Sequence, residues 1–292
     1  MRILIFGKNG QLGWETQRTF ACLGEVTALD FPEVDFTRPN TIQKAILDTS
    51  PTVILNAAGY TNVDRAESEP DLCMQVNSLA PGKIAETAAE VGAFFIHIST
   101  DYVFDGKKGS PYFETDLPNP LSVYAKSKLD GEKLVQAVDQ SYIILRTSWM
   151  YSMRSPCFLT KVLEWAKTNN SLKIVNDQIS NPTSARMLAE IIALMLAKSG
   201  SEPWEFFKKR KGVYHLGGNG YTSRYDWAKK ILELAREKND LPTTQVLPAL
   251  TKDFPTSATR PLFSAINCDK FEKTFRLRIP NWQRSLQLEM EK

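Results

Sequence analysis

Short apolar runs recur along the first half of the chain, and most of them are followed by a stretch with helical periodicity. Their length and apolar content predict buried parallel strands over residues 1–6, 25–29, 51–56, 93–98 and 142–146. The periodic stretches predict helices that end at Phe20, span 81–91, and run from Tyr124 to about Val138. This alternation predicts an α/β fold with a Rossmann-like, doubly wound parallel sheet and right-handed crossovers.

The alternation changes after residue 150. Helices are predicted over residues 158–169, 184–198 and 222–238, the last capped by Thr222 or Ser223, and short strands over 172–175 and 213–216. The tail is expected to be rich in loops because prolines stand at positions 242, 248, 255, 261 and 280. We therefore predict a first domain over residues 1–150, a smaller lobe mainly from residues 151–292, and segments near 184–200 and 213–217 that pack back on the first domain.

Composition and charge narrow the class of protein. The chain has 292 residues and a formal net charge of only +3, which suits an ordinary globular protein with a large core. No apolar run approaches the ~20 residues of a membrane span, and no signal-peptide pattern is present, so we expect a cytoplasmic protein without a membrane partner. The four cysteines are scattered, and the basic run over residues 208–211 has no interleaved aromatics. A nucleic-acid partner is therefore not expected, and no catalytic metal set is indicated.

A glycine-rich turn follows the first predicted strand. Gly7, Gly10 and Gly13 are spaced as G-x-x-G-x-x-G and lead into the first helix. These glycines permit a tight turn, close approach of a pyrophosphate, and close packing of helix on strand. Asp30 ends the second strand, where an acidic side chain can hold an adenosine ribose. This arrangement predicts a dinucleotide-binding site in the first domain.

Tyr124 and Lys128 form the second candidate site feature. Their spacing of four places them on one face of the predicted helix. A phenol beside an ammonium can serve as a proton-transfer group, because a close positive charge lowers the pKa of the phenol. Thr100 and Asp101 follow the fourth strand, at the sheet edge where open α/β sheets bind ligands.

Several motifs together carry a resemblance to a known superfamily: Gly7-x-x-Gly10-x-x-Gly13, Asn56-Ala57-Ala58, Ser99-Thr100-Asp101-Tyr102-Val103-Phe104, Tyr124-x-x-x-Lys128 and Arg146-Thr147-Ser148-Trp149. On these residues the chain resembles the extended short-chain dehydrogenases/reductases. Within that superfamily it resembles the dTDP-4-dehydrorhamnose reductase family, through Val63–Glu69, Asn176-Asp177-Gln178, Pro182-Thr183, and Thr259-Arg260-Pro261 with Ser264. The resemblance covers nearly the whole chain.

The resemblance implies a reduction in deoxysugar and cell-surface polysaccharide biosynthesis. A hydride would pass from NADPH or NADH to C4 of a nucleotide-linked 4-keto-6-deoxy sugar, with dTDP-4-dehydro-L-rhamnose as the expected substrate and dTDP-L-rhamnose as the product. Tyr124 would donate a proton to the developing alkoxide, and Thr100 would hydrogen-bond the same oxygen. Lys128 would lower the Tyr124 pKa and hold the nicotinamide ribose.

The same resemblance assigns binding residues. The sugar would contact Thr100, a hydroxyl of it would bind Asp101, and the ring of Trp149 would pack on it. Besides Tyr124 and Lys128, the expected cofactor contacts come from the glycine turn and from the ends of the second and third strands: Gly7, Gly10, Gln11, Leu12, Gly13, Asp30, Asp35, Phe36, Ala58, Gly59, Tyr60 and Thr61. Each residue also has a structural alternative, since Thr100 and Asp101 can cap a turn and Trp149 can belong to the core.

Other functions stay open at this stage. A sugar-nucleotide epimerase would use the same threonine, tyrosine and lysine, and a non-catalytic regulatory relative would keep the fold. A 4,6-dehydratase is disfavoured, because Tyr102 stands where those enzymes carry a second acid after Asp101. The choice between cofactors is also open: Asp30 opposes a 2′-phosphate, whereas Lys8 or Arg38 can attract one.

Three positions depart from the family pattern. Some members form a magnesium-linked dimer; Glu15 matches one of the acids involved, but Arg186 stands where a second acid is expected. A homodimer and a Mg²⁺ ion thus stay open. Ser180 replaces a common glycine and Arg224 a common tryptophan, which points to a changed sugar pocket or partner surface.

Three further polar residues are interpreted as structural. Asn77 is predicted to be a buried amide that bridges backbone groups near the site. His97 and His215 lie within apolar strands, and we expect them to be satisfied core residues rather than ligands or bases.

Overall fold

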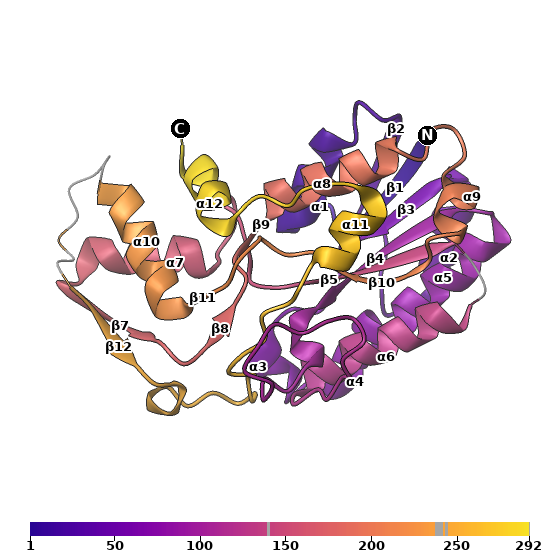
Figure 1. The fold of residues 1–292 in the computed structure, drawn as a ribbon. Helices are drawn as coiled ribbons and strands as arrows, with labels where there is room; N and C mark the ends of the chain where they lie inside the picture. Colours follow the sequence, from indigo (N-terminus) through magenta and orange to yellow (C-terminus); the bar gives the residue numbers. More distant parts are fainter. Residues whose placement is uncertain (139–140, 237–241, 243–244, 292) are drawn as a thin grey trace.

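The computed structural model describes residues 1–138, 141–236, 242 and 245–291. Six parallel strands form its central sheet in the order β10-β5-β4-β3-β1-β2 (Figure 1). Their bounds are β1 Arg2–Phe6, β2 Glu25–Leu29, β3 Val53–Asn56, β4 Phe94–Thr100, β5 Tyr142–Thr147 and β10 Gly212–His215. The strand order reverses between β1 and β3, as it does where doubly wound sheets bind ligands. The predicted fold class is confirmed.

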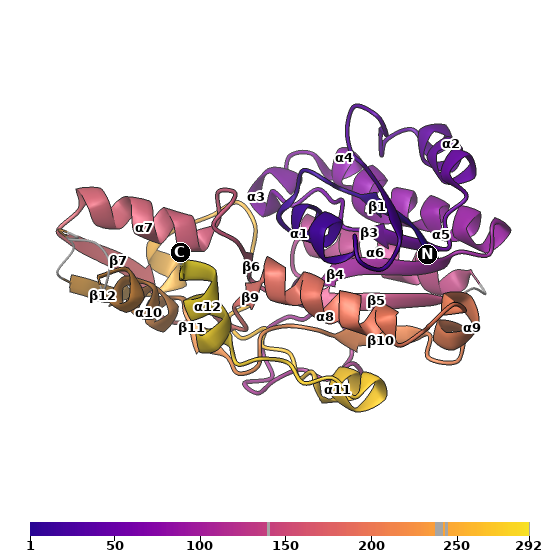
Figure 2. The same cartoon turned by 90° about the horizontal axis from the view of Figure 1, so that it is seen from above.

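Helices cover both faces of the sheet, because its side chains alternate between two apolar layers. Ile3 and Ile5 of β1 pack on one layer, and Leu4 and Phe6 pack on the other. The first layer contains α1 Gln11–Thr19, α8 Ala185–Ala197, α9 Pro203–Lys208 and α11 Asp269–Phe275; the second contains α2 Pro39–Thr49, α5 Ala80–Glu90 and α6 Val123–Ala137 (Figure 2). Figure 2 shows α1 and α8 side by side, so a late segment of the chain completes the early half of the fold.

Several elements of the first half were not predicted. They are α2, α3 Val63–Ala66, α4 Pro70–Met74 and a π-helical turn over Gln75–Leu79. This turn leads directly into α5, which therefore belongs to a longer helical segment than the predicted 81–91. π-helical turns occur most often at functional sites, and this one carries Asn77.

A small lobe lies beside the sheet (Figure 1), and we define it by the elements that share one apolar cluster around Trp227. These elements are α7 Phe158–Thr168, β7 Ser171–Val175, α10 Arg224–Arg236, β12 Gln245–Ala249 and α12 Trp282–Met290. The expected helix over 222–238 begins at Arg224, since Thr222–Ser223 form the short strand β11. Ser223 accepts a hydrogen bond from the Asp226 amide at 3.0 Å, as expected of a cap. Residues 237 and 238 of that prediction lie outside the described residues.

The expectation of a loop-rich tail is wrong in part, because prolines there stand in or next to regular elements. Pro248 lies within β12, which pairs in parallel with β7 in a two-stranded sheet where each strand keeps a free edge. Pro280 directly precedes Asn281, whose side chain caps α12 by accepting a hydrogen bond from the Gln283 amide at 2.9 Å.

Short strand pairs join the small lobe to the sheet. β6 Met150–Tyr151 pairs with β9 Thr183–Ser184, and β8 Ile179–Ser180 pairs with β11. A single bridge also links Ile179 to Phe263. These pairings bring the segments around Ser180 and Phe263 next to the carboxyl end of β4. None of the described helices has both the length and the apolar character to span a membrane.

Candidate active site

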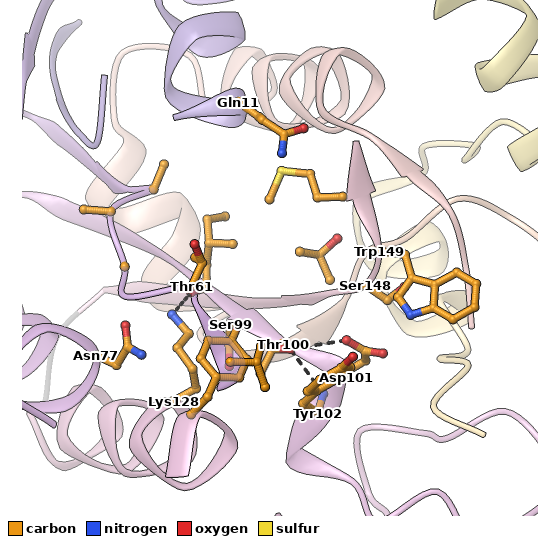
Figure 3. Close-up of a pocket in the computed structure, with 18 of the residues that line it drawn as sticks. Gln11, Thr61, Asn77, Ser99, Thr100, Asp101, Tyr102, Lys128, Ser148 and Trp149 are labelled. Atoms are coloured by element: carbon orange, nitrogen blue, oxygen red, sulfur yellow. Dashed lines mark hydrogen bonds between the residues drawn. The ribbon is translucent and has the colours of Figure 1, made fainter. Parts of the chain in front are cut away.

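A pocket with a volume of about 280 Å³ lies at the carboxyl ends of β3, β4 and β5 (Figure 3). The first turns of α1, α6 and α10 complete its wall. The structure brings together in this pocket nine of the predicted site residues: Gln11, Ala58, Gly59, Thr61, Thr100, Asp101, Tyr124, Lys128 and Trp149.

Tyr124 and Lys128 reach the pocket from the first turns of α6. Ser122 caps this helix by accepting a hydrogen bond from the Ala125 amide at 3.2 Å. Lys128 Nζ donates a hydrogen bond to the carbonyl of Ile98 at 2.6 Å. This bond fixes the position of the ammonium on the pocket wall.

The electrostatics of this pair differ from the expectation. Burial lowers the pKa of Lys128 to about 8. Burial also raises the pKa of Tyr124 well above its ordinary value, and a hydrogen bond with Thr100 opposes this only in part. The expected lowering by Lys128 is therefore not the net result, because desolvation dominates. Tyr124 is held as a neutral phenol, which is the form that can donate a proton.

Thr100 and Asp101 lie where β4 ends. Thr100 Oγ1 accepts a hydrogen bond from the Tyr102 amide at 3.2 Å, capping a single 3₁₀ turn, and donates one to Asp101 Oδ1 at 3.2 Å. The Asp101 side chain is buried, and its other oxygen accepts hydrogen bonds from Ser180, at 3.0 Å, and from Ser264. Burial raises the pKa of Asp101 to about 6, although these hydroxyls favour the charged form. Both carboxylate oxygens thus already have protein partners, with which a sugar hydroxyl would have to compete.

Asn77 connects the pocket floor to α6, and its predicted structural role is confirmed. Its Oδ1 accepts a hydrogen bond from the Tyr60 amide at 2.9 Å, and its Nδ2 donates to the Tyr60 carbonyl at 3.0 Å and to Ser127 Oγ at 3.1 Å. Gly131 of α6 packs so closely that a Cβ there would lie 2.2 Å from the Asn77 carbonyl. The helix that carries Tyr124 is therefore in backbone contact with the segment that carries Asn77.

The glycine turn has the geometry of a dinucleotide cradle. Gly7 has a φ of +88°, and a Cβ there would lie 2.6 Å from the Ala58 amide nitrogen. A Cβ on Gly13 would lie 2.0 Å from the Gly7 carbonyl. Gly10 immediately precedes α1 and leaves the helix N-terminus open to an anion, while Leu12 packs in the core.

The residues expected around the adenosine lie outside the pocket, in the segment that follows β2. Asp30 accepts hydrogen bonds from the amides of Asn9, at 3.1 Å, and Phe31, at 2.8 Å. The carboxylate of Asp35 accepts two hydrogen bonds from Thr37 within its own turn. Their contacts with a cofactor stay predictions.

Four other residues considered for cofactor binding contact protein side chains instead. Two are aromatic residues expected to line the cofactor site, and two are the cations considered for a 2′-phosphate. Phe36 packs edge-on against Phe6, with ring centroids 5.6 Å apart. The Tyr60 hydroxyl donates to Glu69 at 2.6 Å, and Tyr60 does not line the pocket. The considered cations form the ion pairs Lys8–Glu33 and Arg38–Asp35.

Trp149 forms the edge of the pocket nearest the small lobe. Its φ of +37° is unusual for a bulky residue and turns the chain sharply after β5. Its ring stacks on Trp227, with centroids 5.6 Å apart, and the Arg224 guanidinium lies over it at 3.7 Å. The side chain therefore contacts the small-lobe core while lining the pocket, so the core alternative and the binding alternative are compatible.

A buried ion pair joins two of the elements that carry site residues. Glu132 of α6 accepts hydrogen bonds from Arg146 of β5 at 2.9 and 2.7 Å, and a further one from Ser99. Both partners of the ion pair are almost fully buried. The pair ties the helix that carries Tyr124 to the strand that leads to Trp149.

The sequence interpretation gave no ligand contact to several other pocket residues, among them Val63, Thr147, Ser148 and Met150. It singled out Arg224 as a departure that changes the sugar pocket or a partner surface, and Arg224 does line the pocket. Thr147 ends β5 and Ser148 follows it. The rule that ligands bind at the carboxyl ends of strands, which identified Thr100, could therefore have indicated both. Among the described residues, Thr147 Oγ1 and Gln11 Oε1 are buried polar atoms without a hydrogen-bond partner. Unsatisfied groups of this kind on a pocket wall are suited to contact a ligand.

His97 and His215 are core residues, as expected, but the expectation that both are satisfied holds for only one ring nitrogen of each. Both are fully buried, and burial lowers their pKa values, that of His215 to about 3. Each has one ring nitrogen in a hydrogen bond, to Asn56 and to the Tyr112 carbonyl respectively, while the other nitrogen has no partner among the described residues.

Glu15, the acid considered as a magnesium ligand, has the cation Arg186 near it. Arg186 donates to Glu190 at 3.0 Å and partly offsets the burial that raises the pKa of Glu15. Within the described ranges no three His, Cys, Asp or Glu side chains are grouped as metal ligands. The question of a Mg²⁺ ion stays open, as it was from the sequence.

A doubly wound sheet with a glycine cradle and a Thr–Tyr–Lys pocket is the architecture of an extended short-chain dehydrogenase/reductase. The profile of the family described as RmlD substrate binding domain matches residues 1–292. The chain belongs to the dTDP-4-dehydrorhamnose reductase family.

Individual relatives agree with this assignment. The dTDP-4-dehydrorhamnose reductase of Escherichia coli (strain K12) is 40% identical over 288 residues, which cover 97% of this chain and 95% of the relative. The crystal structure of a Clostridium acetobutylicum dTDP-4-dehydrorhamnose reductase is similar with a TM-score of 0.90 and 35% identity, over 99% of this chain and 98% of that one. The Bacillus anthracis dTDP-4-dehydrorhamnose reductase in complex with NADP has a TM-score of 0.89 and 31% identity, over 98% and 97% of the two chains.

Proposed function

We propose that this protein reduces the C4 ketone of a nucleotide-linked 4-keto-6-deoxy sugar, converting dTDP-4-dehydro-L-rhamnose to dTDP-L-rhamnose with NADPH or NADH. The carrying observation is the neutral Tyr124 phenol beside Thr100 and Lys128 in a pocket that adjoins a dinucleotide cradle. The relatives that cover nearly the whole chain bear the name of this activity.

The cradle supports a nicotinamide dinucleotide as cofactor. Side chains are sterically excluded at Gly7 and Gly13. Where the turn meets the pocket, Gln11 Oε1 has no partner among the residues that the structure describes. Gly10 and the N-terminus of α1 would hold the pyrophosphate, Asp30 the adenosine ribose, and Lys128 the nicotinamide ribose. When bound, the reduced nicotinamide supplies the hydride.

The protein's own residues would supply one proton and its placement. As negative charge develops on the sugar oxygen, Tyr124 transfers its hydroxyl proton to that oxygen, so ketone, hydride and proton together give the alcohol. Thr100 Oγ1, which accepts from the Tyr102 amide, would turn its one hydroxyl proton from Asp101 to the same sugar oxygen. The ammonium of Lys128 favours the phenolate that remains, because opposite charges attract strongly in a dry site.

The test is oxidation of NADPH and of NADH with dTDP-4-dehydro-L-rhamnose, by wild type and by Tyr124→Phe. Loss of the proton donor should lower kcat by about 10²–10⁴-fold. Tyr221→Phe is the matched control, because this half-exposed tyrosine lies outside the pocket and should keep wild-type activity. Full activity of Tyr124→Phe would exclude Tyr124 as the donor. Turnover of the sugar nucleotide without net cofactor oxidation would instead favour an epimerase.

A further inference from the structure

Arg224 is a pocket residue with an unusual environment. It is the first residue of α10, and its amide is held by the Gln178 carbonyl at 3.1 Å. Its guanidinium carbon lies over aromatic rings, 3.7 Å from the centroid of Trp149 and 4.7 Å from that of Phe158. Stacking occupies the face of a guanidinium and leaves the N–H donors along its edge free to bind a ligand.

These donors have no partner within the described part of the chain. No carboxylate there forms an ion pair with Arg224, and no side-chain hydrogen bond joins it to a described residue. Arg260 is the contrasting case, since Asp64 binds its guanidinium at 3.0 and 2.6 Å. The other cation on the pocket wall, Lys128, is engaged with the Ile98 carbonyl. Arg224 is therefore the pocket cation that is best placed to receive an anion.

The charge of Arg224 persists in this position. Burial lowers its pKa to about 10, and the nearby Tyr102 and Asp101 counteract that lowering, so the guanidinium remains protonated near neutral pH. A partly buried charge without a counter-ion is costly. An anionic ligand group would remove that cost.

The position of Arg224 also suits one part of the expected substrate. In Figure 3, Lys128 and Trp149 lie on opposite sides of Thr100. The Arg224 guanidinium is on the Trp149 side, because it lies 3.7 Å from the centroid of the Trp149 ring. A sugar whose C4 oxygen meets Tyr124 and Thr100 has C1, which carries the nucleotide diphosphate, across the ring from them. The anion would then reach the small-lobe side of the pocket, away from Lys128.

We propose that Arg224 binds the diphosphate of the nucleotide sugar. This inference rests on the proposed function. The planar fork of an arginine matches phosphate oxygens in pairs, and the stack on Trp149 fixes its plane before the substrate arrives.

The experiment measures binding of thymidine diphosphate and of thymidine by calorimetry, and KM and kcat with the keto sugar nucleotide. Arg224→Gln should weaken thymidine diphosphate binding and raise KM at least tenfold, with kcat and thymidine binding within about twofold of wild type. Arg224→Lys keeps the charge but not the planar guanidinium, so it should lose less affinity for thymidine diphosphate than Arg224→Gln does. Lys229→Gln is the control, because it removes an equal charge from an exposed site on the same helix.

The outcomes separate the two hypotheses. Equal binding of thymidine diphosphate by wild type and Arg224→Gln would overturn the role of Arg224 while leaving the proposed function intact. Equal weakening of diphosphate and nucleoside binding would show that Arg224 only supports the Trp149 stack, and would also overturn it. If wild type bound no nucleoside diphosphate and reduced no sugar nucleotide, the proposed function would fail, and this inference with it.

Discussion

Two carboxylates are buried beside the pocket, and their surroundings balance their charge differently. Glu132 faces a guanidinium, with two hydrogen bonds from Arg146 and one from Ser99. Asp101 is just as inaccessible, yet it has only hydroxyl donors, and no cation in the described part of the chain forms an ion pair with it. An ion pair compensates a buried charge far better than hydroxyls do. We infer that the Glu132 region maintains the fold, whereas the Asp101 region responds to pH.

The largest effect on stability should come from breaking the Glu132–Arg146 ion pair. Glu132→Gln leaves the Arg146 guanidinium buried without a counter-charge, so the free energy of unfolding should fall by about 3–5 kcal/mol. Urea denaturation measures this loss. The double variant Glu132→Leu with Arg146→Met should lose much less, because neither charge remains to be desolvated. A double variant as unstable as the single one would contradict this account of the pair.

Neutralising the other carboxylate should have a smaller effect that depends on pH. Since the folded-state pKa of Asp101 is raised from 3.8 to about 6, the folded protein binds the extra proton, and this group's contribution to stability falls as pH rises from about 4 to about 6. Asp101→Asn removes this dependence. The variant should therefore gain roughly 2 kcal/mol in unfolding free energy relative to wild type between pH 4 and pH 8. Denaturant titrations across that range test it, and a constant difference would refute the raised pKa.

The smallest expected effect comes from removing one hydroxyl beside Asp101. Ser180→Ala removes one hydroxyl that favours the charged form of Asp101, so the pKa of Asp101 should rise further, by about one unit. The measurement is the pH at which the stability of the variant changes most steeply. Ser152→Ala is a suitable control, because that buried hydroxyl contacts the Arg154 amide and not Asp101. If both variants behaved alike, the hydroxyls around Asp101 would have no specific role.

How far the sequence could predict this structure depends on how local each feature is. Buried strands such as β1 and β2 are recognisable from a few adjacent residues, and the strand-end rule then places Thr100 and Gly59 at one sheet edge. Ser180 and Ser264 reach Asp101 across 79 and 163 positions of the chain, a pairing that no local pattern contains.

The same distinction applies to the small lobe and to the pKa values. β12 has no strand pattern of its own and becomes one only because β7 lies beside it. The spacing of Tyr124 and Lys128 reveals a nearby charge but not the depth of burial, which sets the direction of the Tyr124 pKa.

The strand order carries a consequence for synthesis of the chain on the ribosome. β5 lies inside the finished sheet only because β10 pairs with its outer side, and β10 follows only after α7, β7, α8 and α9. While those intervening segments emerge, Ile143, Ile144 and Leu145 form an open apolar edge, the kind of surface that promotes association between unfinished chains. The nascent protein is thus most exposed to aggregation over this interval, until translation has passed His215.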